Sequence, residues 1–482
     1  MGEKKILYYA NTFHYNLINP MDRQHLEYKK VLIMGLGLHG GGLASARFFL
    51  NAGAKVVITD LKSEKELDSS IKKIRAVKSP FQPHYVLGRH RRSDFKNVDI
   101  VIRNPAVPDD SSYLEIARKH GIPVHTDVSF FMMTLHRLNL NVKGLACAPT
   151  SIGITGTKGK SSTASLLHHV LLHCGKKSLL AGNIRKSPLT NYQLRIINYE
   201  YIILELSSWH LESLNEHKLA PDIAIITNIL PDHLNRYKNF NEYVKAKSYI
   251  FKHQKKEDIL LLNKRDDVSR KFIGKIHSRL IWYSIDANRS LKSSPTTFLH
   301  SDSICAVSVV CDCLRLNKKS VQKIILSFKG LEGRLELAAT IKGVSYFNDT
   351  CATQPDATIF GMQKLINQRP KIGKLALIAG GSDKNLNYTN LAEAIKKYCS
   401  YAIIYKGANS DTASDKIIEE LQKINYTLVI VKKTLADCVK TAASWTKKGD
   451  AVLFSPAASS FGKFKHEFDR GDQFKKSVNA LK

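Results

Sequence analysis

A short glycine-rich segment in the first half of the chain has the residue types of a phosphate-binding loop. Residues 153–163 read GITGTKGKSST, and residues 156–161 within them end in Gly-Lys-Ser. Glycines allow the backbone to turn so that successive N–H groups converge on a phosphate. The Lys160 ammonium could neutralise the outer phosphates, and the Ser161 hydroxyl is a suitable Mg²⁺ ligand. The segment therefore indicates that a nucleotide phosphate binds here.

The spacing of this loop differs from that of the common P-loop. In the common pattern the first glycine would stand at Ile154, whereas the glycines of this chain are Gly153 and Gly156. The stretch from Thr163 onward has helical character, so a helix N-terminus would point at the same phosphate. An ordinary glycine-rich turn before a helix is the alternative interpretation of this segment.

Other polar residues follow apolar runs that have the character of buried strands. Glu205 ends the run YIILE, and His233 lies in the segment that follows the run DIAIIT. Because ligands bind at the carboxyl ends of parallel strands, we expect Glu205, His233 and the loop 156–161 to meet at one rim. Mg²⁺ prefers carboxylate and hydroxyl oxygens, so Glu205 could bind a metal opposite Ser161. Taken singly, Glu205 could be a salt-bridged acid and His233 a packing histidine.

A second glycine-rich turn lies near the N-terminus. The apolar run VLIM leads into GLGLHG at residues 35–40, then into a helical segment and a second apolar run that ends in Asp60. This order of strand, turn, helix and strand is the dinucleotide-binding fingerprint, and by itself it favours NAD or FAD. Asp60 would then contact a ribose hydroxyl or another polar group of a nucleotide. Gly41 and Gly42 lengthen the turn and alter the usual geometry.

The chain is too long for a single core. Its 482 residues suggest about three domains of roughly 150 residues each. Strands that alternate with helices predict an α/β fold with mostly parallel sheets. We expect a lead-in segment, a Rossmann-like domain, a central P-loop ATPase domain with a mostly parallel sheet and a Rossmann-like C-terminal domain, at residues 1–28, 29–146, 147–330 and 331–482.

The composition restricts the class of partner and the location. Lysine and arginine number 73 against 42 acidic residues, and the formal net charge of +31 favours anionic partners. The basic residues are scattered, whereas nucleic-acid-binding proteins usually concentrate them, so we expect no nucleic acid. The eight cysteines form no CxxC pair and are expected to be reduced. No apolar run is long enough to span a bilayer, so we expect a cytoplasmic location. We also expect a monomer.

Six motifs, taken in order, resemble those of the Mur ligase family. They are GITGTKGKSS, LELSS, TNILPDHLNRY, NDT-x-AT, GG-x-DK and SPA-x-x-SF, and the resemblance covers about residues 30–475. It implies a Rossmann-like domain for a UDP moiety, a central ATPase domain and a Rossmann-like domain for an amino acid. On this view the turn at 35–40 does not require NAD.

The resemblance also implies a reaction in peptidoglycan precursor biosynthesis. ATP would phosphorylate the carboxylate of UDP-N-acetylmuramoyl-L-alanine (UDP-MurNAc-L-Ala), and the amine of D-glutamate would attack the acyl phosphate. The protein would position the reactants and neutralise charge, with ATP and two Mg²⁺ ions as cofactors. A related ligase for L-glutamate or another amino acid is the near alternative. An NAD-dependent oxidoreductase and a nucleic-acid-associated P-loop ATPase are more distant ones.

The resemblance assigns roles to individual positions. The residues that would serve ATP are Gly156, Thr157, Lys158, Gly159, Lys160, Ser161, Ser162, Arg334 and Asp349. The metal ligands would be Ser161, Glu205, His233 and Lys247, the last at a position where the family has a carbamylated lysine. The catalytic residues would be Lys160, Glu205, His233 and Lys247. The substrate contacts would be His39, Asp60, Asn183 and Ser207 for the UDP-sugar and Thr353, Lys384, Ser460 and Phe461 for glutamate.

Four positions depart from the family pattern: Asn104-Pro-Ala106 stands where the family has Ser-Pro-Gly, Gly41-Gly42 is an insertion, and the other two affect the ATP site. Cys351 stands where the family usually has a lysine, which removes a cation from the phosphate region. Ser301 follows His300 where the family has a His-Asn pair, which affects an expected adenine contact. We still expect an active ligase, because the phosphate and metal residues are all present.

Overall fold

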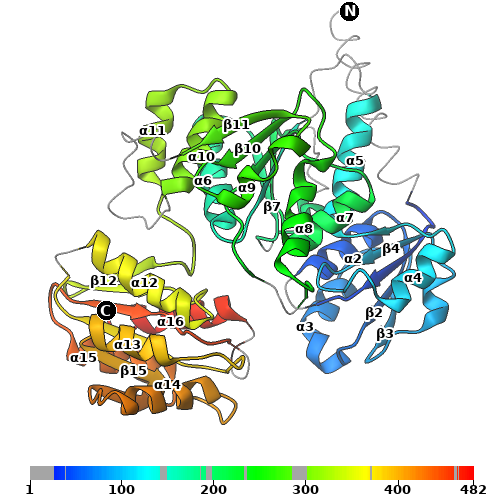
Figure 1. The fold of residues 1–482 in the computed structure, drawn as a ribbon. Helices are drawn as coiled ribbons and strands as arrows, with labels where there is room; N and C mark the ends of the chain where they lie inside the picture. The colour runs from blue at the N-terminus through cyan, green and yellow to red at the C-terminus, as the bar shows by residue number, and fades with distance from the viewer. Residues whose placement is uncertain are drawn as a thin grey trace, which may run out of the picture. The chain divides into compact units, whose positions relative to one another are not determined.

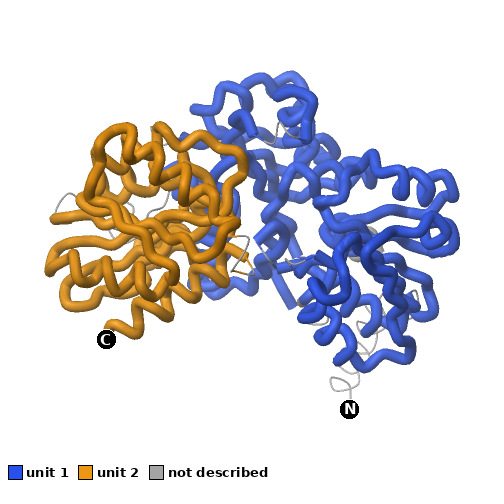
Figure 2. Tube along the Cα trace, turned by 90° about the horizontal axis from the view of Figure 1, so that it is seen from below, with its two compact units in different colours: residues 1–291, 301–324 blue, residues 292–300, 325–482 orange. Residues whose placement is uncertain are grey.

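The protein forms two compact units. A computed structural model gives its structure and describes residues 26–37, 40–141, 149–184, 186–191, 198–232, 236–284, 301–369, 372–460, 464 and 466–482. The first unit comprises residues 1–291 and 301–324, and the second comprises residues 292–300 and 325–482 (Figure 2). The lead-in segment predicted at residues 1–28 lies almost entirely outside the described residues. Among the helices that are described, none is long and apolar enough to cross a bilayer.

The first sheet of the first unit is entirely parallel, in the order β3-β2-β1-β4-β5 (Figure 1). Its strands are β1 (Lys30–Met34), β2 (Lys55–Asp60), β3 (His84–Leu87), β4 (Ile100–Arg103) and β5 (Val124–His125). Its helices are α2 (Gly41–Asn51), α3 (Glu64–Arg75), α4 (Ser112–Lys119) and α5 (Asp127–Asn141), with a 3-10 turn at Arg92–Phe95. Alternate residues of a strand face opposite sides of its sheet. Val31 and Ile33 therefore join the core beneath α2, whereas Leu32 and Met34 join the one beneath α4.

The second sheet of the first unit is also entirely parallel, in the order β11-β10-β9-β6-β8-β7. Its strands are β6 (Thr150–Thr155), β7 (Ser178–Gly182), β8 (Tyr201–Glu205), β9 (Ile223–Ile226), β10 (Ile259–Asn263) and β11 (Arg279–Tyr283). Its helices are α6 (Lys160–His173), α7 (Ser208–Glu216), α8 (Phe240–Lys252), α9 (Asp267–Arg270), α10 (Ser301–Cys313) and α11 (Lys318–Ser327). Short 3-10 turns lie at Pro188–Asn191 and Ile273–Lys275.

The second unit contains the third sheet, in the order β12-β13-β17-β14-β15-β16. Its strands are β12 (Glu336–Ile341), β13 (Val344–Asn348), β14 (Leu375–Ala379), β15 (Tyr401–Tyr405), β16 (Val429–Lys432) and β17 (Ala451–Phe454). Its helices are α12 (Pro355–Gln368), α13 (Thr389–Tyr398), α14 (Thr412–Lys423), α15 (Leu435–Trp445) and α16 (Glu467–Asn479). β12 pairs antiparallel with β13, and the other pairs are parallel. The predicted α/β class is confirmed.

The first two sheets share a single hydrophobic core, which explains why three sheets form only two compact units. Phe49 and Phe131, from the helices of the first sheet, belong to the same buried cluster as Leu204 and Leu211 from the second. Leu189, in the 3-10 turn that follows β7, belongs to this cluster as well. Because apolar burial is the main stabilising contribution to folding, the two sheets stabilise each other.

Polar contacts at the edge of this core also join the first sheet to α7. The Ser213 hydroxyl of α7 donates to the Ser129 hydroxyl of α5 at 2.9 Å. The Arg118 guanidinium donates to both carboxylate oxygens of Glu216, at 2.9 and 3.1 Å, and to Asp109 Oδ1 at 2.6 Å. A two-point contact between arginine and carboxylate is stronger and more directional than a single-point ion pair.

We predict that Arg118 and Glu216 are energetically coupled. In a double-mutant cycle with Arg118→Met and Glu216→Gln, the coupling should be about 1 kcal/mol in urea unfolding followed by tryptophan fluorescence. The pair Asp68 and Lys72, an exposed ion pair on α3, is the matched control and should couple by about 0.3 kcal/mol. Equal coupling in the two cycles would contradict a joining role for Arg118.

Candidate active site

The predicted phosphate loop lies between β6 and α6 and requires its glycines. Gly159 caps α6 in the left-handed conformation with φ of 86°, and Gly156 has φ of 145°. A Cβ atom at Gly156 would overlap the Thr227 hydroxyl and come within 3.0 Å of the Asn228 carbonyl oxygen. A side chain at Gly156 would therefore displace the end of β9.

Residues after β9 hold the loop in place. The N–H of Thr157 donates to the Asn228 carbonyl at 2.8 Å, and the N–H of Lys158 donates to Asn228 Oδ1 at 3.0 Å. The Thr227 hydroxyl donates to the Lys158 carbonyl at 2.6 Å. The loop is therefore held in one conformation by protein contacts alone. Both Thr227 and Asn228 follow β9, and the sequence predicts the segment from Asn228 to His233 at this rim but gives Thr227 no role.

The start of α6 is suited to bind an anion. The Gly159 cap supplies no side-chain acceptor, and the first turn of α6 carries no acidic residue. The N–H groups of a helix start, left without a capping side chain, favour bound phosphate. Lys160 Nζ donates to the carbonyls of Gly156 and Thr157, at 2.9 and 3.0 Å, so its charge lies over the loop. Ser161 and Ser162 follow it and are half-buried.

Glu205 ends β8 beside this loop and is suited to bind a cation. Its side chain is 1% exposed. Oε1 accepts a hydrogen bond from Asn183 Nδ2 at 3.2 Å, whereas Oε2 has no hydrogen-bond partner among the described residues. A buried carboxylate oxygen without a donor is costly unless a cation binds it. The donor chemistry of Glu205 and of the Ser161 hydroxyl therefore fits Mg²⁺.

Lys247 is buried on the same rim. It lies on α8 with 2% of its surface exposed, and its Nζ donates to Thr155 Oγ1 at 3.1 Å. Burial, and then the charge of Lys160, hold the pKa of Lys247 well below its usual value, while Asp232 and Glu205 oppose this shift. Thr155, the last residue of β6, thus joins the lysine to the phosphate loop. The sequence analysis missed Thr155 because a threonine at a strand end is a common residue.

The two residues predicted to touch the muramoyl group lie next to Glu205. The Asn183 N–H donates to the Glu205 carbonyl at 2.8 Å, which complements the side-chain contact between the same residues. Ser207 caps α7, and its hydroxyl lies 3.1 Å from His210 Nδ1. The structure therefore brings Asn183 and Ser207 to the rim that carries Lys160, Glu205 and Lys247. Three further predicted site residues, His39, His233 and Phe461, lie outside the described residues.

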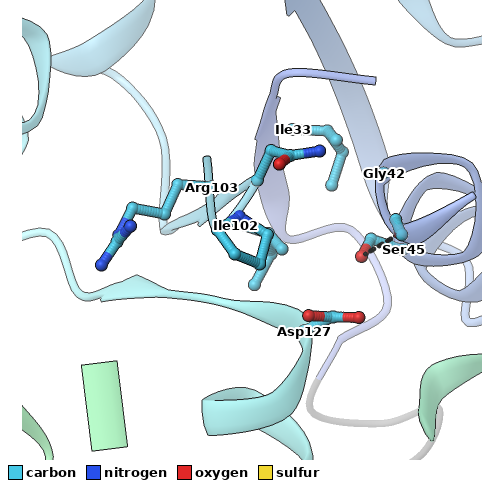
Figure 3. Close-up of a pocket in the computed structure, with 9 residues that line it drawn as sticks. Ile33, Gly42, Ser45, Ile102, Arg103 and Asp127 are labelled. Carbon is cyan, nitrogen blue, oxygen red and sulfur yellow. Dashed lines mark hydrogen bonds between the residues drawn. The ribbon is translucent and has the colours of Figure 1, made fainter. Parts of the chain in front are cut away.

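A pocket opens at the carboxyl ends of β1 and β4 in the first sheet (Figure 3). Its walls are formed by Ile33, Gly41, Gly42, Ser45, Ile102, Arg103, Asn104, Pro105 and Asp127. Figure 3 shows that the Arg103 guanidinium extends away from Ser45. Asp60 does not line the pocket. Its carboxylate accepts the N–H groups of Gly37 and Lys62 at 3.1 and 2.9 Å. Asp60 therefore braces the glycine-rich turn, and its contact with a nucleotide stays a prediction.

The second unit places several predicted residues at one edge of its sheet. Thr353, Ser460 and Lys384 follow β13, β17 and β14, which are neighbouring parallel strands. Parallel strands end at the same edge, so the three loops are adjacent there. Ser382 and Ser459 pair as an antiparallel bridge between two of these loops.

Asp349 lies at the same edge but faces inward. Its carboxylate accepts the Leu335 N–H at 3.1 Å and the Ser455 hydroxyl at 2.8 Å. Burial raises the pKa of Asp349 to about 7, although these hydrogen bonds and Arg334 lower it. Asp349 thus connects the β13 and β17 loops, and Arg334 is exposed beside them. Their predicted roles toward ATP stay predictions.

Three family matches cover most of the chain. Residues 29–126 match the MurD-like N-terminal domain of Mur ligases. Residues 154–324 match the Mur ligase middle domain. Residues 333–458 match the Mur ligase glutamate ligase domain.

Relatives and solved structures agree with these matches. The UDP-N-acetylmuramoylalanine–D-glutamate ligase of Borreliella burgdorferi (strain ZS7) is 36% identical over 479 residues, which cover 93% of this chain and 97% of the relative. The ligase of the same name from Roseiflexus sp. (strain RS-1) is 32% identical, with coverage of 94% and 99%. In fold, the chain resembles the UDP-N-acetylmuramate–alanine ligase MurC of Thermotoga maritima, with a TM-score of 0.59, 18% identity and coverage of 94% and 100%. The chain belongs to the Mur ligase family.

Proposed function

We propose that this Mur ligase joins D-glutamate to UDP-MurNAc-L-Ala and converts ATP to ADP and phosphate. The names of the relatives at 36% and 32% identity support this choice of substrates. The observation that carries the ligase chemistry is the buried Glu205 oxygen that has no hydrogen-bond partner among the described residues, beside the phosphate loop and Lys247. The product is a precursor of peptidoglycan, made in the cytoplasm.

The phosphate loop binds the phosphates of ATP. The N–H groups at the start of α6 face the phosphates, and the loop before them is already ordered by the contacts of Lys158 with Thr227 and Asn228. Lys160 exchanges its two loop carbonyl partners for phosphate oxygens and neutralises them. Preordered donors are effective in catalysis because little reorganisation is needed during the reaction.

Glu205 and Ser161 hold Mg²⁺ at this rim. The unpaired Glu205 oxygen and the Ser161 hydroxyl are the donor types that the ion prefers. When bound, the ion would neutralise negative charge on the phosphates of ATP. Asn183 fixes the other Glu205 oxygen at 3.2 Å and so orients the carboxylate.

Lys247 serves a second ion as a carbamate. Its burial favours the neutral amine, and a neutral amine adds to CO2 with release of one proton. The N–C bond that forms converts the cation into an anionic group with carboxylate-type oxygens, which suit Mg²⁺. His233 is the other protein ligand in this assignment.

The reaction then proceeds in two displacements. A carboxylate oxygen of UDP-MurNAc-L-Ala attacks the γ-phosphorus, and ADP leaves. The glutamate amine attacks the resulting acyl carbon, loses a proton, and phosphate leaves from the tetrahedral intermediate. Asn183 and Ser207 position the first substrate, and Thr353, Lys384, Ser460 and Phe461 position glutamate. The protein thus contributes orientation and charge neutralisation.

The proposed substrates can be tested by phosphate release. With ATP, Mg²⁺ and UDP-MurNAc-L-Ala, the protein should release phosphate on addition of D-glutamate and not of L-glutamate. Lys160→Ala should abolish turnover, because it removes the cation that neutralises the phosphates. Release that depends on L-glutamate would reassign the amino acid. Absence of release with either glutamate would refute the proposed function.

The role of Lys247 is tested by replacement and rescue. Lys247→Ala should lower kcat by at least about a hundredfold, because it removes the anionic group formed on the amine. Added acetate should restore part of the activity by supplying a carboxylate, whereas Lys247→Arg should stay inactive. The control is Lys245→Ala, which changes an exposed lysine on the same helix and should keep normal activity. Activity of Lys247→Arg would contradict the carbamate.

The conformation of the phosphate loop is tested at Gly156. Gly156→Ala should lower kcat/KM for ATP by about a hundredfold, because its Cβ would displace Thr227 and the loop. Gly175→Ala is the matched control: Gly175 also has a positive φ, of 77°, but has open space around a Cβ position. It should cost about 1 kcal/mol of stability and leave the kinetics unchanged. Equal kinetics in the two variants would contradict the steric requirement at Gly156.

A further inference from the structure

Arg470 occupies an unfavourable position for a cation. It lies in the first turn of α16 and is 1% exposed. None of the described carboxylates forms an ion pair with it. Burial of a cation is costly, and a cation near a helix N-terminus opposes the helix dipole, although Glu467 in the same turn offsets part of this cost. Packing alone therefore does not explain why a buried arginine stands at this position.

The guanidinium of Arg470 connects two loops by four hydrogen bonds. Nη1 donates to the carbonyl oxygens of Ala458 and Ser459, both at 3.1 Å. Nη2 donates to the Thr350 carbonyl at 3.0 Å, and Nε donates to the Thr350 hydroxyl at 3.3 Å. Thr350 lies in the loop after β13, and Ser459 lies in the loop after β17. One planar group thus fixes the distance between these loops.

The loop after β14 is the third loop of this edge, and Ser459 connects it to the Arg470 guanidinium. The Ser459 N–H donates to the Ser382 carbonyl at 3.0 Å, and the Ser382 N–H donates to the Ser459 carbonyl at 3.2 Å. Gly381 permits this approach, because its Cβ would stand 2.6 Å from the Ser459 oxygen and 3.4 Å from Arg470 Nη1. The Ser459 carbonyl therefore accepts hydrogen bonds from both Ser382 and Arg470.

We propose that Arg470 is a positioning residue for the incoming amino acid. By holding the three loops together, it places Thr353, Ser460 and Lys384 at the spacing that binds glutamate. This inference rests on the proposed function, which assigns the amino acid to these loops. The planar fork of arginine is essential to the role, since a lysine ammonium is a point donor that cannot bridge both loops with the same geometry.

The charge of Arg470 also acts on Lys384. Desolvation lowers the pKa of the Lys384 amine, Glu467 opposes this shift, and the charge of Arg470 adds a smaller lowering. Arg470 therefore lies close to the lysine that the proposed function assigns to glutamate.

The test is a comparison of Michaelis constants in the full-length protein. Arg470→Lys should raise KM for D-glutamate by about tenfold or more, and change KM for ATP and for UDP-MurNAc-L-Ala by less than about twofold. Lys475→Met is the matched control, because Lys475 lies on the same helix and pairs with Glu332 and Asp472 instead of the loops. It should leave all three constants unchanged.

A chemical rescue separates positioning from loss of stability. In Arg470→Ala, millimolar guanidinium should lower KM for D-glutamate toward the normal value, and methylammonium should not. If the substitutions at 470 prevent folding, Gly381→Ala places a Cβ 2.6 Å from the Ser459 carbonyl that accepts from Arg470, and it should raise KM for D-glutamate selectively. An unchanged KM for glutamate in Arg470→Lys, or an equal rise for all three substrates, would overturn the positioning role. Absence of glutamate-dependent turnover in the unmodified protein would instead overturn the proposed function.

Discussion

The constraint on which the site depends is the burial of charge at the ends of β6 and β8. Glu205 and Lys247 are both almost completely buried, and one Glu205 oxygen has no donor among the described residues. In an isolated protein this arrangement is costly, because water no longer solvates either group. Under the proposed function, a bound metal and nucleotide would offset this cost. The hydrogen bond that Asn183 donates to Glu205, and the one that Lys247 donates to Thr155, can therefore be understood as the support that keeps these groups in place.

Much of the fold and part of the site could be predicted from the sequence. The apolar runs of β1, β6, β8 and β17 are recognisable because strands of parallel sheets are buried on both faces. The phosphate loop and Glu205 were found because glycines, Gly-Lys-Ser and an acid at a strand end are rare in combination. Asp60 shows what such patterns leave out. Its position at the end of β2 predicts a nucleotide contact, which stays a prediction, and only the structure shows that its oxygens accept two backbone N–H groups.

Other residues could not be predicted, because their roles arise only from tertiary contacts. Arg470 is one of 73 basic residues, and its burial depends on loops that lie far from it in the sequence. Thr227 carries no motif of its own, and only the close approach of Gly156 shows why its hydroxyl matters. The sequence also did not indicate that the first two sheets share one core. Strand patterns show that a strand is buried, but they do not show which elements pack against it.

That shared core has a consequence for any attempt to divide the protein. The family match to residues 29–126 suggests a separable module, but Phe49 and Phe131 pack in the same cluster as Leu204 and Leu211. Expression of that module alone would omit Phe131 and leave Phe49 without part of its cluster, and exposed apolar surfaces of this kind promote aggregation. Insertions and gene fusions in this region would meet the same difficulty. The two sheets are therefore expected to fold as a pair.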